Sequence, residues 1–249
     1  MSSREIYVSI ALGDEKHFVG RLWCHYRKGR ERAAFEYDEG WLQHEEHFAL
    51  EPALALTAGA FHTLADQSLF GSIGDSSPDR WGRVLMRRAE AQRARSAGET
   101  QRTLGEVDFL LGVNDEARQG ALRFSDSPEG PFLASREYRA IPPLVDLPEI
   151  LSAAERFLDE DESSEDLRLL LAPGSSLGGA RPKASVRDDD GQLTIAKFPR
   201  KDDENNTVVW EAVALELAEM AGLTVPSWKL LKIAAVSYTH LTLPTICSV

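Results

Sequence analysis

Apolar and polar residues alternate along the first 37 residues in the manner of β-strands. Alternating runs cover residues 6–11, 18–26 and 33–37, and polar turns at 13–15 and 27–32 separate them. An alternation with a period of two places every second side chain on the same face of a sheet. The pattern therefore predicts a small antiparallel sheet at the start of the chain.

Helical periodicity and hairpin signals follow further along the chain. Ser77 can cap a helix whose first turn holds Pro78, and Gly222 stands just past the last turn of another. The turn at 188–191 is typical of a hairpin loop. Helices are expected at residues 51–64, 78–95, 103–111, 146–158 and 208–220, and further strands at 120–124, 183–187 and 192–198.

A run of acidic residues at 159–166 follows the fourth expected helix. Such a run is too charged to pack, so we expect it to be a solvated connection. The mixture of segregated strands and helices predicts an α+β chain. We place one domain at residues 1–145 and a second part at 146–235.

The last fourteen residues, 236–249, read VSYTHLTLPTICSV and differ from the rest of the chain. No charged residue follows Lys232, although 27% of the whole chain is charged. Residues 236–241 can be encoded by GTC TCT TAT ACA CAT CTG, which resembles a transposase end sequence used in DNA libraries. We therefore expect 236–249 to be a non-native tail, and 1–235 to be the N-terminal part of a longer protein. The alternative is a genuine buried strand.

Composition excludes several classes of function. The net charge of -12 argues against non-specific binding to nucleic acid or to an anionic membrane. Cys24 and Cys247 are the only cysteines, which excludes a disulfide framework and a cysteine metal site and favours a cytoplasmic protein. No segment approaches the ~18 apolar residues of a membrane span. His44 and His47 lack further candidate ligands nearby, so no metal site is predicted.

The densest chemical signal is the segment 174–183, G-S-S-L-G-G-A-R-P-K. Small residues at 178–180 let backbone N–H groups approach a phosphate, and Lys183 supplies a cation beside them. The segment is not a Walker loop, because Ala180 and Arg181 stand where Lys and Ser or Thr are needed. A plain flexible loop is the alternative interpretation.

Two charged residues downstream strengthen the phosphate hypothesis. Lys197 interrupts an apolar strand, where a charge is costly unless it is paired, although a surface-facing lysine is also possible. Glu211 lies on the expected helix near Val208 and Leu215, where a carboxylate needs a cation. A glycine-rich loop, a strand lysine and a helix glutamate follow in this order in the nucleotide-clamping half of protein kinases.

These segments resemble HipA-type toxins over nearly all of residues 5–235. The kinase-core segments that carry the resemblance are S-L-G-G-A-R-P-K (176–183), I-A-K-F-P (195–199) and the helix and loop at 210–226. The N-terminal segments are D-S-S-P-D-R-W-G-R (75–83), F-L-L-G-V-N-D (109–115) and G-A-L-R-F (120–124). The resemblance implies that 146–235 is the N-lobe-like front of a protein-kinase-like core.

HipA-type toxins are serine/threonine kinases that use ATP and Mg²⁺. They are encoded beside a DNA-binding antitoxin and reach operator DNA only through that complex, and some phosphorylate an aminoacyl-tRNA synthetase. The resemblance implies that Lys197 contacts the ATP phosphates and that Glu211 orients Lys197. Ser176 matches a serine that is autophosphorylated, where about two added negative charges would repel ATP and expel the loop. The implied phosphate loop consists of Gly178, Gly179, Ala180, Arg181, Pro182 and Lys183.

The residues that perform phosphoryl transfer are expected downstream of this chain. The family needs a catalytic Asp, an Asn and a metal-binding Asp beyond residue 235, so we expect no catalytic residue or metal ligand here and no kinase activity. The consecutive acids at 188–190 suit a solvated turn rather than a metal site.

Other functions remain open at the level of sequence. The chain could be a non-catalytic antitoxin-binding co-repressor module, or a phospholipid-type kinase with the same fold. Six arginines make the helix after Pro78 basic, which suits either antitoxin or DNA contact or a solvated helix face. They are Arg80, Arg83, Arg87, Arg88, Arg93 and Arg95.

Overall fold

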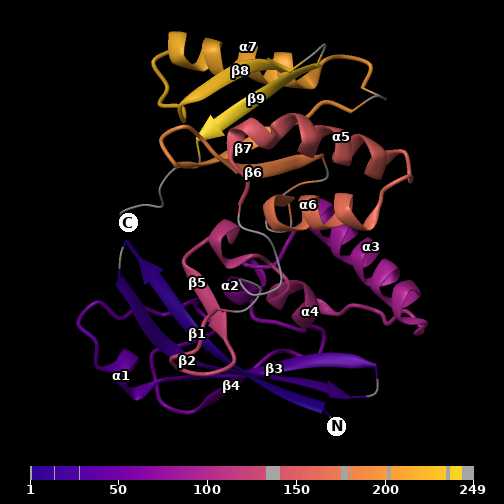
Figure 1. Cartoon of the computed structure of the whole chain (residues 1–249). Helices are drawn as coiled ribbons and strands as arrows, with labels where there is room; N and C mark the ends of the chain where they lie inside the picture. The colour runs from indigo at the N-terminus through magenta and orange to yellow at the C-terminus, as the bar shows by residue number, and fades with distance from the viewer. Residues whose placement is uncertain are drawn as a thin grey trace. The chain divides into compact units, whose positions relative to one another are not determined.

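The chain has an α+β fold with two antiparallel sheets (Figure 1). The computed structural model describes residues 2–13, 15–27, 29–132, 141–174, 179, 181–200, 203–233 and 236–242. The chain divides into two compact units, of which the first holds Met1–Pro78 and Arg102–Glu137 and the second holds Asp79–Gln101 and Tyr138–Val249. Within the described ranges, no helix is long and apolar enough to cross a membrane.

The first unit is built on a five-stranded sheet in the order β4-β3-β2-β1-β5. Its strands are β1 (Ser2–Leu12), β2 (Glu15–Arg27), β3 (Arg30–Tyr37), β4 (Ala60–His62) and β5 (Leu122–Ser125). Its helices are α1 (Glu39–Leu42), α2 (Gly71–Gly74), α4 (Glu106–Leu111) and the short 3-10 helix η1 (Asp115–Ala117). The alternation seen in the sequence buries Ile6, Val8 and Leu22 completely. The prediction of an N-terminal antiparallel sheet is therefore confirmed.

The helix expected at residues 51–64 is absent, and this prediction is wrong. The segment forms turns and then enters β4. Gly59 adopts a φ of +110°, which a right-handed helix excludes. The hydroxyl of Tyr37 donates to the carbonyl oxygen of Leu54 at 2.9 Å, so a tertiary contact replaces the expected helical hydrogen bond. Leu54 is fully buried.

The second unit combines a four-stranded sheet, in the order β6-β7-β9-β8, with four longer helices among its described residues. The strands are β6 (Lys183–Arg187), β7 (Leu193–Lys197), β8 (Trp228–Ile233) and β9 (Val236–Thr242). The helices are α3 (Arg80–Ala97), α5 (Leu147–Leu158), α6 (Ser164–Gly174) and α7 (Thr207–Met220), and η2 (Leu144–Asp146) precedes α5. The expected hairpin of β6 and β7 and the expected helices at α5 and α7 are confirmed.

Helix α3 belongs to the second unit, which differs from the predicted division at residue 145. It packs beside α6, as Figure 1 also shows. The indole ring of Trp81 meets Phe157 of α5 edge to face, with 5.3 Å between ring centroids, and Leu85 is fully buried. Burial of this apolar stripe explains why α3 joins the second unit although the chain before it belongs to the first.

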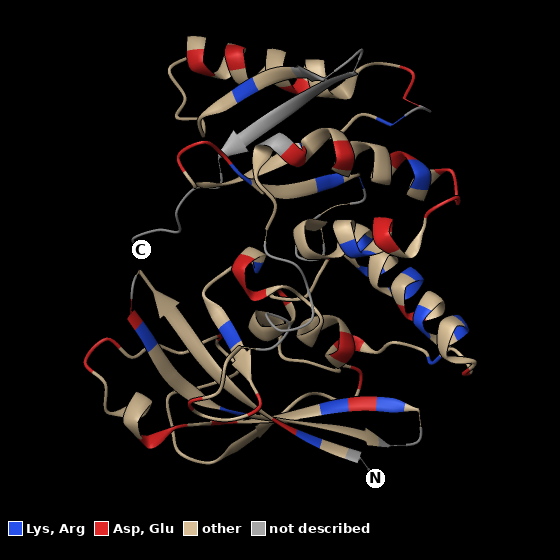
Figure 2. Cartoon of the chain, viewed as in Figure 1, with Lys and Arg blue, Asp and Glu red and all other residues tan. Residues whose placement is uncertain are grey.

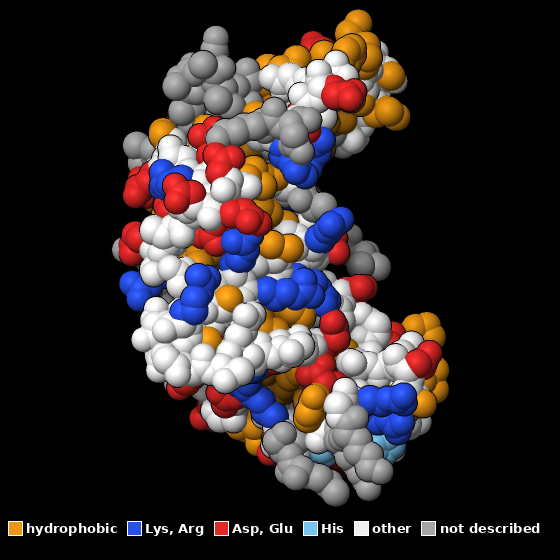
Figure 3. Space-filling model, turned by 90° about the vertical axis from the view of Figure 1, so that its right-hand side faces the viewer, with side chains coloured by type: hydrophobic (Ala, Val, Ile, Leu, Met, Phe, Trp, Pro, Cys, Tyr) orange, Lys and Arg blue, Asp and Glu red, His pale blue; other side chains and the backbone are white. Residues whose placement is uncertain are grey.

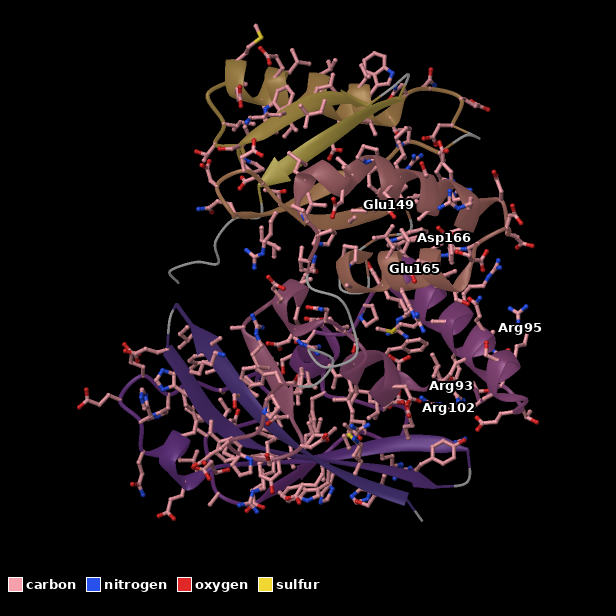
Figure 4. All side chains as sticks on the ribbon, viewed as in Figure 1. Arg93, Arg95, Arg102, Glu149, Glu165 and Asp166 are labelled. Atoms are coloured by element: carbon pink, nitrogen blue, oxygen red, sulfur yellow. The ribbon has the colours of Figure 1, made fainter. Side chains whose placement is uncertain are left out.

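Helix α6 begins within the acidic run that we expected to be a solvated connection. Figure 4 shows Glu165 and Asp166 on this helix. Asp166 is 5% exposed, accepts from the backbone N–H of Ser163 at 2.9 Å and is paired with Arg156. The Arg156 guanidinium is the main reason why the pKa of Asp166 lies below its usual range. Pairing and capping thus overcome the charge that argued against packing.

Residues 236–242, within the segment that we expect to be a non-native tail, form β9 between β7 and β8. Val236 lies opposite Ile233 of β8, and Leu241 lies opposite both Trp228 of β8 and Ile195 of β7. The segment VSYTHLT is rich in β-branched and aromatic residues, which favour strands whatever their origin. The adapter-like origin of the segment stays a prediction.

Candidate functional site

The β6–β7 hairpin places two lysines directly opposite each other. Lys183 at the start of β6 is the register partner of Lys197 at the end of β7. Like charges in opposed cross-strand positions destabilise a sheet. The arrangement therefore needs either a neutralising neighbour or an anionic ligand.

Glu211 neutralises one of these lysines. Its Oε1 forms an ion pair with the Lys197 ammonium group, and each side chain is 31% exposed. Helix α7 directs Glu211 to the sheet because Val208 and Ala212, on the same side, are buried. Asn206 caps the helix by accepting from the Val209 N–H at 3.1 Å. The structure thus brings together the lysine and the glutamate that the sequence predicted to pair.

The opposite face of α7 is apolar and exposed. Trp210, Leu217 and Met220 are 64%, 58% and 77% exposed. Figure 3 shows the hydrophobic side chains of this part of the chain at the top of the view. Because the face with Val208 and Ala212 is buried and the face with Trp210, Leu217 and Met220 is exposed, the helix has one orientation, and this orientation positions Glu211.

Lys183 lies in a partly buried, strongly charged setting. Burial lowers the pKa of its ammonium group, the charge of Lys197 lowers it further, and the charges of Asp79 and Glu211 act in the opposite direction. A charged ligand of negative sign would act in the same direction as these two carboxylates.

Gly179 is the described residue of the small-residue loop, and it lies against Lys183. Its φ is +82°, and a Cβ at this position would come within 2.8 Å of the Lys183 Nζ. Glycine therefore satisfies both the backbone conformation and the approach of the ammonium group. Ser176, Gly178 and Ala180 lie outside the described residues, so their roles stay predictions.

Arg181 ties the other side of the loop to the start of α7. Its Nη1 donates to the Asp203 carboxylate at 2.6 Å and to the Thr207 hydroxyl at 2.9 Å. This guanidinium is the main reason why the pKa of Asp203 is lowered. Pro182 is buried, and its carbonyl oxygen accepts from the Phe198 N–H at 3.2 Å. The loop is thus held to both the hairpin and the helix.

Sequence reasoning missed two residues of α3 and its cap that contact the loop. Asp79 and Trp81 form hydrogen bonds to Gly179 and Lys183. The segment 75–83 contributed to the family resemblance, but nothing in its composition indicated contact with a loop about a hundred residues away.

Two of the six arginines of α3, Arg88 and Arg93, form ion pairs within their own unit. Figure 2 shows basic positions along α3 and acidic positions between α5 and α6. Arg88 pairs with Glu160 and Glu162, and Arg93 pairs with Glu90 and Glu99. These contacts neutralise Arg88 and Arg93 within the unit, and contact of α3 with an antitoxin or with DNA stays a prediction.

The other candidate sites give weaker indications of a function. Among the residues that the structure describes, no group of three His, Cys, Asp or Glu could hold a metal ion. The carboxylate of Asp188 accepts from the N–H groups of Asp190 and Gln192, as in a tight turn. A cavity of about 1090 Å³ in the first unit is lined by both acidic and basic residues, and burial raises the pKa of its Cys24 thiol to about 12. Burial thus disfavours the thiolate form of Cys24.

Two protein-family models match the chain. The model of the HipA N-terminal domain matches residues 11–111, and the model of the HipA-like C-terminal domain matches residues 175–243. No curated protein sequence matches the chain.

Among solved structures, the chain is similar to HipA of Shewanella oneidensis MR-1 in its complex with HipB and operator DNA. The sequence identity is 15% and the TM-score is 0.49. The match covers 97% of this chain and 51% of that chain, so this chain spans about half the length of that HipA.

Proposed function

The chain belongs to the HipA family, whose two domain models together match more than half of it, and we propose that it is the ATP-holding part of a serine/threonine kinase toxin. The observation that supports the proposal most directly is the group formed by Lys183, Lys197 and Glu211. It joins two opposed cations and one carboxylate beside a glycine backbone.

Two opposed ammonium groups beside a glycine backbone suit an anionic ligand. The charge of Lys197 lowers the pKa of Lys183, whereas the carboxylates of Asp79 and Glu211 act in the opposite direction. A polyphosphate would add to the effect of these carboxylates, because its oxygens can accept from both ammonium groups. In this proposal Glu211 holds Lys197 in place, and Lys197 and Lys183 hold the phosphates.

The described residues fit the phosphates of ATP better than they fit a metal ion. Gly179 lets the backbone approach a phosphate. Lys183 lies beside Gly179, and Lys197 lies opposite Lys183 across the hairpin. When bound, ATP supplies the phosphoryl group, whereas the Mg²⁺ ligands are expected outside this chain. We therefore propose that the chain binds ATP and does not transfer phosphate by itself.

The proposed partners follow from membership of the family. They are a DNA-binding antitoxin, operator DNA through that antitoxin, and a protein substrate that could be an aminoacyl-tRNA synthetase. Each of these partners is a proposal for a whole HipA-type protein.

The decisive experiment measures ATP binding by the whole chain with Lys197→Met as the test variant. We expect Lys197→Met to weaken ATP binding by about tenfold or more, because a charge-assisted hydrogen bond is lost. Lys229→Met is the matched control, since Lys229 is an exposed lysine of β8 in the same sheet. Equal affinities in the wild type and both variants would refute the proposal.

Three further results would redirect the assignment. Failure of the wild type to bind ATP, combined with tight binding of an antitoxin, would favour the non-catalytic co-repressor module. Phosphate incorporation into a protein above the Lys197→Met level would refute the expected lack of transfer. Incorporation into a phospholipid instead would support the lipid-kinase alternative.

A further inference from the structure

The first turn of α3 holds the glycine loop through three hydrogen bonds. The Gly179 N–H donates to Oδ2 of Asp79 at 2.7 Å, and the Gly179 carbonyl oxygen accepts from the Trp81 N–H at 3.0 Å. The indole Nε1–H of Trp81 donates to the Lys183 carbonyl oxygen at 3.2 Å. Both backbone groups of Gly179 and the carbonyl of Lys183 are therefore fixed by two residues.

The anchoring residues are themselves held in place by packing. Trp81 is 4% exposed and meets Phe157 edge to face. Gly174 at the end of α6 lets the indole approach, since a Cβ there would come within 3.1 Å of the Trp81 Nε1. Because the Trp81 indole is rigid and lies on a packed helix, its N–H holds the loop in one position.

Asp79 also acts on the charge of the loop. Its carboxylate attracts the Lys183 ammonium group, which the charge of Lys197 repels. Asp79 thus favours a loop position in which Lys183 stays charged beside Gly179. Asp79 is exposed, so its replacement should leave the fold intact.

We propose that Asp79 and Trp81 are positioning residues that hold Gly179 and Lys183 in the arrangement that receives a nucleotide phosphate. This inference rests on the proposed ATP-binding function. Fixing the loop before the ligand arrives lowers the ordering cost of binding. The first turn of α3 therefore belongs to the nucleotide site, although it precedes the loop by about a hundred residues.

The first test measures hydrogen exchange of the peptide that contains Gly179 in the absence of nucleotide. We expect Asp79→Ala to speed exchange about two- to tenfold, which corresponds to the loss of one hydrogen bond. Asp79→Asn keeps an acceptor oxygen and should restore slow exchange. Trp81→Phe keeps the ring and removes the indole N–H, and we expect faster exchange in the same peptide. Arg95→Ala, at the far end of α3 in Figure 4, is the control that should change nothing.

The second test measures the dissociation constant for ATP in the same variants. We expect Asp79→Ala and Trp81→Phe to bind about two- to tenfold more weakly, with partial rescue by Asp79→Asn, which keeps the acceptor oxygen but not the charge. Unchanged hydrogen exchange in Asp79→Ala, or hydrogen exchange as fast in Asp79→Asn as in Asp79→Ala, would overturn the anchoring. Faster exchange with unchanged ATP affinity would overturn the positioning role while leaving the proposed function intact. A wild type that binds no ATP, with the exchange effects present, would instead refute the proposed function.

Discussion

Replacing Glu211 by Gln should destabilise the chain and expose the repulsion between the two hairpin lysines. Exposed ion pairs contribute about 0.2–1 kcal/mol, whereas breaking a buried pair costs about 3–5 kcal/mol. Both side chains of the Lys197–Glu211 pair are 31% exposed, which places the pair between these limits. We therefore expect Glu211→Gln to lower the free energy of unfolding by about 1–2 kcal/mol.

The same reasoning predicts couplings of opposite sign for the two lysines. In a double-mutant cycle, Lys197→Met should lose most of its effect once Glu211 is Gln, because the ion pair is already broken. In the Glu211→Gln background, Lys183→Met should instead lower the free energy of unfolding by less than it does in the wild type, or raise it. Without Glu211, Lys183 and Lys197 face each other with less compensation.

Urea unfolding followed by circular dichroism gives the required free energies for the single and double variants. Lys229→Met on β8 serves as the control for removal of a lysine charge from the same sheet. A coupling energy below about 0.3 kcal/mol between Lys197 and Glu211 would refute the assigned pair. Strict additivity of Lys183→Met with Glu211→Gln would refute the repulsion.

Three further predictions address the rest of the fold. Arg118 is fully buried and donates to three backbone carbonyl oxygens, so Arg118→Lys should lower the free energy of unfolding by about 2–4 kcal/mol; a loss below about 1 kcal/mol in urea unfolding would contradict this. Arg156 lowers the pKa of Asp166, so the stability that this carboxylate contributes is present above about pH 4 and is lost as the pH falls further. Asp166→Asn should be less stable at pH 7 and lose less stability on acidification, and equal pH profiles would argue against the pair. Deleting residues 236–249 removes β9, and the amides of β7 and β8 should then exchange faster; unchanged exchange would show that the strand adds no stability.

Local patterns sufficed for those parts of the fold that local contacts stabilise. The alternation at 6–11 and 18–26 matches β1 and β2, and the turn at 188–191 matches the β6–β7 hairpin. The Lys197–Glu211 pair was also predictable, because a glycine-rich loop, a strand lysine and a helix glutamate follow in the order known from protein kinases.

Long-range contacts explain the failures. The segment 51–64 has helical periodicity. However, the Tyr37 hydroxyl donates to the carbonyl oxygen of Leu54, and the positive φ of Gly59 prevents a right-handed helix from running through it. The acidic run at 159–166 appeared unable to pack because its partner, Arg156, lies on the preceding helix. In both cases the competing interaction comes from a residue outside the window in which periodicity is read.

The position of α3 changes how the two family domains should be separated in experiments. The HipA N-terminal domain model includes α3, whereas the packing of Trp81 and Leu85 places this helix with the glycine loop. A polypeptide cut at residue 145 would expose that apolar stripe and deprive the loop of Asp79 and Trp81. Loss of ATP binding by a fragment that begins at 146 would therefore not argue against the nucleotide site. Point variants in the whole chain separate antitoxin binding from ATP binding more cleanly, because they leave α3 against α6.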